Sequence, residues 1–241
     1  MTKIKKYVAE MIGTFVLVFV ACGVAVWSNV DIVATALSFG LVIVAMAYSI
    51  GNISGCHINP AVSLAMFIRK ELTLKDFLFY VLAQVIGATL GALVLGLVLR
   101  ADFATLGGNT IQPLLQANVV TGELDAQSYI WAFVIELVLT FIFVIAIIGV
   151  TDKKHHEGHQ AGLVIGGALT LVHLLGLGFT GTSVNPARSF GPAVIQAILG
   201  QDTTSLSQLW IWILAPLAGG ALAAVVYNLM ANKKVEVVEN K

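Results

Sequence analysis

Two Asn-Pro-Ala triplets are the residues of this sequence whose types and spacing stand out. They are Asn59-Pro60-Ala61 and Asn185-Pro186-Ala187, and each follows a glycine-rich approach inside a very apolar chain. An Asn side chain can cap a helix, and Pro fits the first helical position because its missing N–H is not needed there. Each triplet therefore predicts a helix that begins beside an amide able to donate an N–H to a nearby oxygen atom.

The triplets belong to an internal duplication that covers nearly the whole chain. Asn59 and Asn185 are 126 positions apart, and so are Glu10 and Glu136. Further along, the offset grows to 132, so the second copy has six additional residues after its triplet. A long internal repeat indicates duplicated structure and not a chance motif. We expect one domain over 1–241, with repeat 1 over about 7–100, a linking loop over 101–128 and repeat 2 over about 129–231.

Composition predicts an integral membrane protein. The chain is 58% hydrophobic and 11% charged, with a mean hydropathy of +0.93, which excludes an ordinary soluble domain. Six apolar stretches, three from each repeat, are long enough to cross about 30 Å of hydrocarbon as helices. We expect them near 7–27, 32–50, 77–99, 129–150, 161–179 and 209–231.

Charge sets the expected orientation in the membrane. Nearly all Lys and Arg fall on one side of the predicted spans, and only Arg100 and Arg188 fall on the other. By the positive-inside rule both termini are cytoplasmic, as in a multi-pass protein of the cell membrane. Because three spans per repeat is an odd number, the two repeats are inverted relative to each other.

The segments beside the triplets predict two re-entrant half-helices. Residues 51–58 and 178–184 are too polar and glycine-rich for a continuous helix, and the apolar stretches that follow end at Ile68 and near Leu199. Non-helical backbone at membrane depth is tolerated where it is buried in protein or lines a water-filled cavity. A helix N-terminus carries roughly half a positive charge, so two such ends facing one passage repel cations and protons. The loop residues expected to line it are Gly55, Cys56, His57, Gly181 and Ser183.

Other polar residues admit two interpretations. Glu10 and Glu136 lie inside predicted spans. They are either proton-coupling sites or structural residues that accept hydrogen bonds from backbone N–H groups of the adjacent loops. Their symmetry and their place near helix ends favour the structural role. The loop with His155, His156 and His159 is a metal site, a pH gate or, as we favour, a solvated connector.

The sequence resembles the aquaporin (major intrinsic protein) family from end to end. The resemblance rests on Ser-Gly-Cys-His-Ile-Asn-Pro-Ala-Val, on Thr-Ser-Val-Asn-Pro-Ala-Arg-Ser, on Glu10-Met-Ile-Gly-Thr and on Asp152-Lys153. It implies an all-α membrane protein with six transmembrane helices, two half-helices, one pore per subunit and a homotetramer.

The resemblance also implies a selectivity filter. The matching positions are Phe39, His173, Thr182 and Arg188, a set similar to that of bacterial water channels of the aquaporin Z type. Ser189 and Ala193 resemble the same set, whereas Ile213 is more typical of glycerol channels. Cys56 aligns with Thr182 through the repeat, which predicts a thiol near the pore.

The favoured function is a passive water channel, with glycerol or other small neutral solutes, such as protonated lactic acid or hydrogen peroxide, as the alternative cargo. An ion-coupled secondary transporter also uses inverted repeats and broken helices, and its only candidate coupling carboxylates are Glu10 and Glu136. The pattern has no nucleophile–base pair or metal-ligand spacing at membrane depth. We therefore expect no enzymatic activity, no cofactor, no metal and no nucleic-acid partner.

Overall fold

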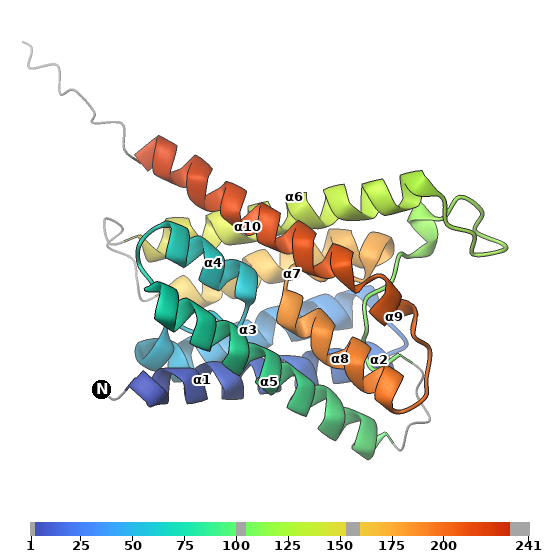
Figure 1. The fold of residues 1–241 in the computed structure, drawn as a ribbon, viewed down its shortest axis with the longest axis horizontal. Coiled ribbons are helices and arrows are strands. Elements are labelled where there is room, and N and C mark those ends of the chain that lie inside the picture. Colours follow the sequence, from blue (N-terminus) through green and yellow to red (C-terminus); the bar gives the residue numbers. More distant parts are fainter. Residues whose placement is uncertain (1–2, 100–104, 153–159, 232–241) are drawn as a thin grey trace, which may run out of the picture.

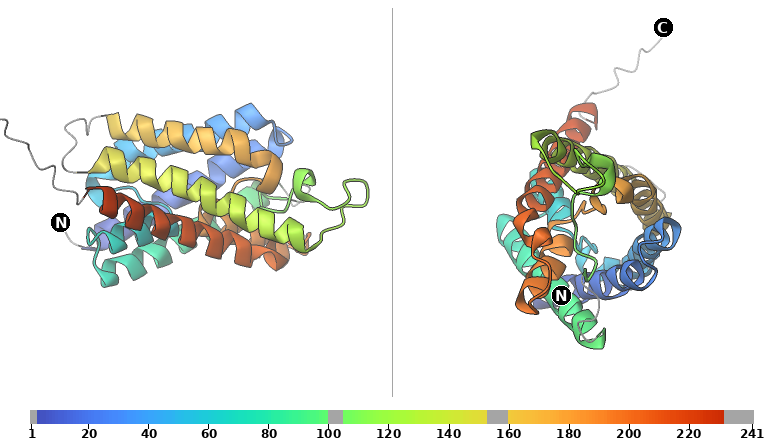
Figure 2. Two further views of the ribbon diagram at one scale, coloured as in Figure 1. Left: turned by 90° about the horizontal axis from the view of Figure 1, so that it is seen from above. Right: turned by 90° about the vertical axis from the view of Figure 1, so that its right-hand side faces the viewer.

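The computed structural model describes residues 3–99, 105–152 and 160–231. Within these ranges the regular structure is helical apart from one isolated β-bridge between Asn118 and Glu123. Six helices are long and apolar enough to cross a membrane. The right-hand view of Figure 2 shows them as a ring seen from its end. They are the first span, formed by α1 (Lys3–Val16), η1 (Leu17–Cys22) and α2 (Gly23–Trp27), then α3 (Ile32–Ser54), α5 (Leu74–Val98), α6 (Ala126–Thr151), α7 (Ala161–Thr180) and α10 (Leu209–Ala231).

Two of the spans end later than the sequence predicts. The expectation that the second span stops before Gly51 is wrong, because α3 continues to Ser54, and α7 likewise runs through Gly176 and Gly178 to Thr180. Staying helical keeps backbone N–H and C=O groups paired at membrane depth. The true ends are Gly55 and Gly181, which adopt left-handed φ values of 89° and 66° that cost glycine little.

The two predicted half-helices are present. Helix α4 (Pro60–Ile68) and helix α8 (Pro186–Ile198) are each far shorter than the spans around them. At 1.5 Å per residue they extend about 14 Å and 20 Å, less than the hydrocarbon thickness. Figure 1 shows them entering the bundle from its opposite ends.

Glycines let the spans pack through their backbones. A Cβ atom added at Gly87 would collide with the carbonyl oxygen of Met11, and one added at Gly219 would collide with that of Leu137. Small residues at helix contacts allow this close approach in membranes. Met11 and Leu137 are 126 positions apart, and Gly87 and Gly219 are 132 apart, so the two contacts follow the offsets of the sequence duplication.

Two of the connections between spans contain short helical segments. The segment between α5 and α6 contains η2 (Pro113–Leu115), and α9 (Thr204–Ser207) precedes α10. Leu106 and Asn109 are fully buried, so this connection folds back onto the bundle. The three-histidine segment lies in 153–159, outside the described residues.

Candidate pore and selectivity filter

Three cavities lie in series through the bundle. A vestibule of about 270 Å³, here called the His57 vestibule, shares Ile43, His57 and Phe143 with a narrow cavity of about 10 Å³, the waist. The waist shares Arg188 with a second vestibule of about 250 Å³, the Arg188 vestibule. The shared walls define a path with two wide ends and a narrow middle.

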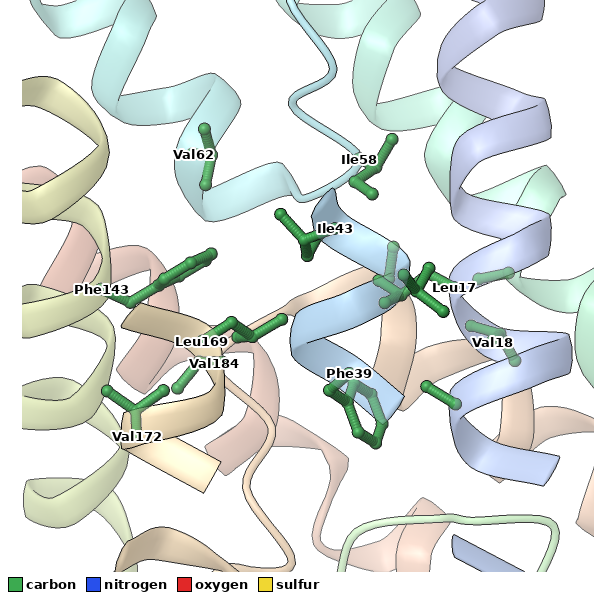
Figure 3. Packing of buried hydrophobic residues seen from close by; sticks show 14 of the residues in the cluster. Leu17, Val18, Phe39, Ile43, Ile58, Val62, Phe143, Leu169, Val172 and Val184 are labelled. Atoms are coloured by element: carbon green, nitrogen blue, oxygen red, sulfur yellow. The ribbon is translucent and has the colours of Figure 1, made fainter. Parts of the chain in front are cut away.

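The waist has room for about one water molecule, because a cavity of roughly 10–15 Å³ is the smallest that holds one. Much of its wall is apolar. Figure 3 shows Phe39, Ile43 and Leu169 converging there with Ile58 and Val184 of the two loops. The polar side chains of the wall are those of His57, Asn59, His173, Ser183, Asn185 and Arg188.

The two Asn side chains of the triplets meet at the waist. Each caps its half-helix: Asn59 Oδ1 accepts from Ala61 N, and Asn185 Oδ1 accepts from Ala187 N and Arg188 N. An amide nitrogen carries two N–H donors. One donor of each is bound across the waist, and the other has no partner among the described residues, so it can serve a molecule in the path.

The crossing bonds connect the two loops. Asn59 Nδ2 donates to the carbonyl oxygen of Val184 at 2.8 Å, and Asn185 Nδ2 donates to that of Ile58 at 2.9 Å. The carbonyl groups of Val184 and Ile58 belong to the two loops beside the triplets. These two each accept one bond from the opposite loop, so each has one lone pair engaged.

Glu10 holds the first loop from inside the bundle. Its fully buried carboxylate accepts from the backbone N–H of His57 at 2.9 Å and of Ile58 at 2.6 Å. Gln84 Nε2 donates a third bond at 2.8 Å. These partners fit a carboxylate that supports the loop.

Glu136 makes the corresponding contacts to the second loop. Its carboxylate, also fully buried, accepts from the backbone N–H of Ser183 and of Val184, both at 2.8 Å. The Thr180 hydroxyl donates the third bond at 2.6 Å. Each loop is thus held by its own carboxylate, which accepts three hydrogen bonds.

The carboxylates support a strained backbone. Ile58 and Val184 have φ values of 39° and 44°, which are unusual for β-branched residues. Such conformations persist where the surroundings fix them. Here each of these N–H groups points at a buried carboxylate, a charge-assisted bond stronger than a neutral one.

Phe39, His173 and Arg188 come together at the end of the waist nearer Arg188. The Phe39 and His173 rings stack with centroids 4.2 Å apart, and the Arg188 guanidinium carbon lies 4.9 Å from the Phe39 centroid. His173 Nδ1 lies 2.9 Å from the carbonyl oxygen of Leu169, so in the neutral ring Nδ1 carries the proton and Nε2 is an acceptor. His173 Nε2 and Arg188 Nε are buried without a partner among the described residues, which provides one acceptor and one donor beside the path.

The linking segment holds Arg188 in place. Arg188 Nη1 donates to the carbonyl oxygen of Gly107 at 2.7 Å and to Asn109 Oδ1 at 2.5 Å. Asn109 also accepts from Ser189 Oγ and donates to the carbonyl oxygen of Thr180. The sequence alone does not single out Asn109 within the linking loop. A Gly-Gly-Asn sequence is typical of a turn, and it gives no signal of a distant Arg partner.

The remaining loop residues differ in position. Gly55 and Cys56 line the His57 vestibule, Ser183 lines the waist and Gly181 lines the Arg188 vestibule. Thr182 is fully buried with an unpartnered hydroxyl, yet it lines none of these three cavities.

Span six contributes no wall to the waist. Ile213, which in sequence favoured a glycerol channel, is half-buried and lies outside the waist lining. Its neighbour Trp212 is fully buried in a separate apolar cluster with Ile111, Ala132 and Ile211. The difference at Ile213 therefore does not change the residues that surround the narrow part of the path.

Comparison with known proteins agrees with this geometry. The model of the family described as major intrinsic protein matches residues 1–227. Aquaporin Z of Rhodopseudomonas palustris is 40% identical over 97% of this chain and 96% of its own length. Glycerol uptake facilitator protein-like 6 of Lactiplantibacillus plantarum is 38% identical over 95% of this chain and 99% of its own.

A solved structure shows the same fold. The aquaglyceroporin from Plasmodium falciparum superposes with a TM-score of 0.79 at 22% identity, covering 96% of this chain and 98% of the other. Members of the matched family are membrane channels and not enzymes, and the six apolar helices, the paired half-helices and the narrow path through the bundle all fit such a channel. With a family model matching nearly its full length, this chain belongs to the major intrinsic protein family.

Proposed function

We propose that the protein is a passive channel that conducts water and excludes larger solutes, ions and protons. The observation that carries the proposal is the narrow part of the path. A waist with room for about one water molecule contains His173 Nε2 as a free acceptor and Arg188 Nε as a free donor. A water molecule can satisfy both kinds of group, which offsets part of the cost of leaving bulk solvent.

Charge along the path supports ion and proton exclusion. The N-termini of α4 and α8 meet at Asn59 and Asn185, and the Arg188 guanidinium adds a full positive charge. Among the described residues that line the waist there is no carboxylate. The positive ends therefore oppose the entry of cations and protons.

An ion-coupled transporter is the less favoured mechanism. Its candidate coupling groups, Glu10 and Glu136, are not among the residues that line the waist, and each accepts three hydrogen bonds. A coupling carboxylate is protonated once in every transport cycle, and each protonation would weaken its bonds to those loop N–H groups. The contacts suit a fixed support better.

Glycerol remains the second candidate cargo, because one similar protein is named a glycerol uptake facilitator protein-like 6. A carbon backbone needs a wider throat with an apolar wall. In this chain the waist is narrowed by the stacked Phe39 and His173 rings and by Arg188. That arrangement favours water.

Orientation and assembly follow from charge and family. Lys6 lines the His57 vestibule, and Arg69 caps the end of α4 on that side. The positive-inside rule makes this the cytoplasmic end, so we propose that both termini are cytoplasmic in a cell membrane. The exposed apolar side chains of the spans face the lipid bilayer. The homotetramer is an expectation from the family resemblance.

Stopped-flow light scattering on proteoliposomes tests the proposal. A gradient of an impermeant osmolyte should give fast shrinkage with a low activation energy, and a glycerol gradient should give no fast re-swelling. Fast re-swelling in glycerol would assign the protein to the solute-conducting branch. Shrinkage no faster than in protein-free liposomes would reject the channel itself.

A further inference from the structure

Thr35 is a polar residue beside the path that neither the sequence nor the family resemblance singled out. It lies on α3 four residues before Phe39, so the two side chains share one face of the helix. Thr35 lines the Arg188 vestibule but not the waist, whereas Phe39 lines the waist but not that vestibule. Thr35 is therefore one helical turn further out along the same wall.

The Thr35 hydroxyl is buried without a partner. The residue is fully buried, and Oγ1 makes no hydrogen bond to any of the described residues. A Thr in a helix commonly donates to the carbonyl oxygen four residues earlier. Thr14 and Thr89 do so here, at 2.7 and 2.8 Å.

Leaving a buried hydroxyl unpaired is unfavourable, so a partner that the protein itself does not supply is expected. The vestibule wall on which Thr35 lies also contains Gly107 and Arg188. The molecule that passes through this vestibule is the available partner.

We propose that Thr35 is a further permeation residue, whose hydroxyl forms the outermost hydrogen-bonding site of the filter. A water molecule that enters from the Arg188 vestibule loses neighbours before it reaches His173 Nε2 and Arg188 Nε. A bond to Thr35 Oγ1 at that point replaces part of what it loses. The inference rests on the proposed water conduction.

Three variants test it in proteoliposomes. Thr35→Val keeps the shape and removes the hydroxyl, and Thr35→Ser keeps the hydroxyl. Thr89→Val is the matched control, because Thr89 bonds its own helix and lines none of the three cavities. Water flux per channel, its activation energy and the thermal unfolding midpoint in detergent are measured for each.

We expect Thr35→Val to lower water flux about two- to tenfold, the range for one lost hydrogen bond, and to raise the activation energy. Thr35→Ser and Thr89→Val should conduct like the wild type. The unfolding midpoint of Thr35→Val should not fall, because the variant removes an unpaired polar atom.

Wild-type flux in Thr35→Val would overturn the inference while leaving the channel function intact. A lower flux accompanied by a lower unfolding midpoint would also overturn it, since that pair of changes indicates a structural role. If the wild type itself conducts no water, both this inference and the proposed function fail.

Discussion

Asn59 and Asn185 each donate a side-chain N–H to the carbonyl oxygen of the residue that precedes the other. The bonds run from Asn59 to Val184 at 2.8 Å and from Asn185 to Ile58 at 2.9 Å. Each half-helix is therefore capped by a residue that also fixes the opposite loop. The geometry of one loop depends on the presence of the other.

Replacing Asn185 with Asp should damage both stability and selectivity. The substitution removes the donor to Ile58 and directs a carboxylate oxygen at a carbonyl oxygen. We expect a loss of about 1–3 kcal/mol in the free energy of unfolding, together with a proton leak measured by a pH-sensitive dye inside vesicles. Asn118→Asp is the control, because Asn118 lies in an exposed turn where its Oδ1 only accepts. A leak equal to that of the wild type would contradict the role of Asn185 in proton exclusion.

Glu136→Gln tests whether the buried carboxylate is a support. The amide keeps one oxygen but directs an NH₂ group at donors from Ser183, Val184 or Thr180, which leaves at least one of them unpaired. We expect the unfolding free energy to fall by about 1–3 kcal/mol and water flux to fall with it. If instead the variant folds normally, and an imposed proton gradient drives solute uptake in the wild type alone, then Glu136 is a coupling site.

Two substitutions at Asn109 separate its two roles. Asn109→Ala removes the acceptor that holds Arg188 and Ser189, so we expect altered conduction as the guanidinium moves in the throat. Asn109→Asp keeps an acceptor for Arg188 and loses the donor to Thr180, so conduction should stay close to wild type while stability falls by about 1 kcal/mol. Stopped-flow water flux and thermal unfolding distinguish the variants. Equal water flux in Asn109→Ala and wild type would show that Gly107 alone positions Arg188.

Thiol reagents should block the channel through Cys56. Its side chain is partly exposed and lines the His57 vestibule, whereas Cys22 is fully buried. We expect a mercurial to reduce water flux in the wild type and in Cys22→Ser, and to have little effect on Cys56→Ser. The same block in all three proteins would place the reactive site elsewhere.

Helix contact through glycine should tolerate no added methyl group. In Gly87→Ala the new Cβ would collide with the carbonyl oxygen of Met11, so the first and third spans must move apart. We expect a loss of about 1–3 kcal/mol in stability. Gly167→Ala is the control, because a Cβ there meets no atom within 4 Å, and Ala favours a helix over Gly. The measurement is the thermal unfolding midpoint in detergent. Equal midpoints for the two variants would contradict the close packing at Gly87.

The spans and half-helices were predictable because their signals are local. Twenty or so apolar residues predict a membrane helix, and Asn before Pro predicts a helix start. The positions at which the helices end were harder to predict from the sequence. Polar and glycine residues near Gly51 indicated an early stop, but the main-chain bonds of α3 continue to Ser54, and Gly55 is the first residue with the left-handed φ that ends a helix.

Contacts between distant segments were the part that the sequence could not supply. Asn109 meets Arg188 across 79 positions, and nothing beside either residue marks the pairing. Thr35 is one of several Thr residues within the apolar helices, and it is distinguished by its missing partner together with its place on a cavity wall. The loop donors to Glu10 and Glu136 were easier to foresee, because the duplication gave two copies of one arrangement.

Because Gly107 and Asn109 hold Arg188, the connection between α5 and α6 helps to set the geometry of the filter. The exposed turn at Val119 and Val120 carries no such contact, so an epitope tag inserted there should leave water flux unchanged. A tag inserted beside Gly108 would pull away the carbonyl and amide that anchor the guanidinium. A change made in this one stretch of chain, outside the membrane-spanning helices, is therefore expected to alter what passes through the channel.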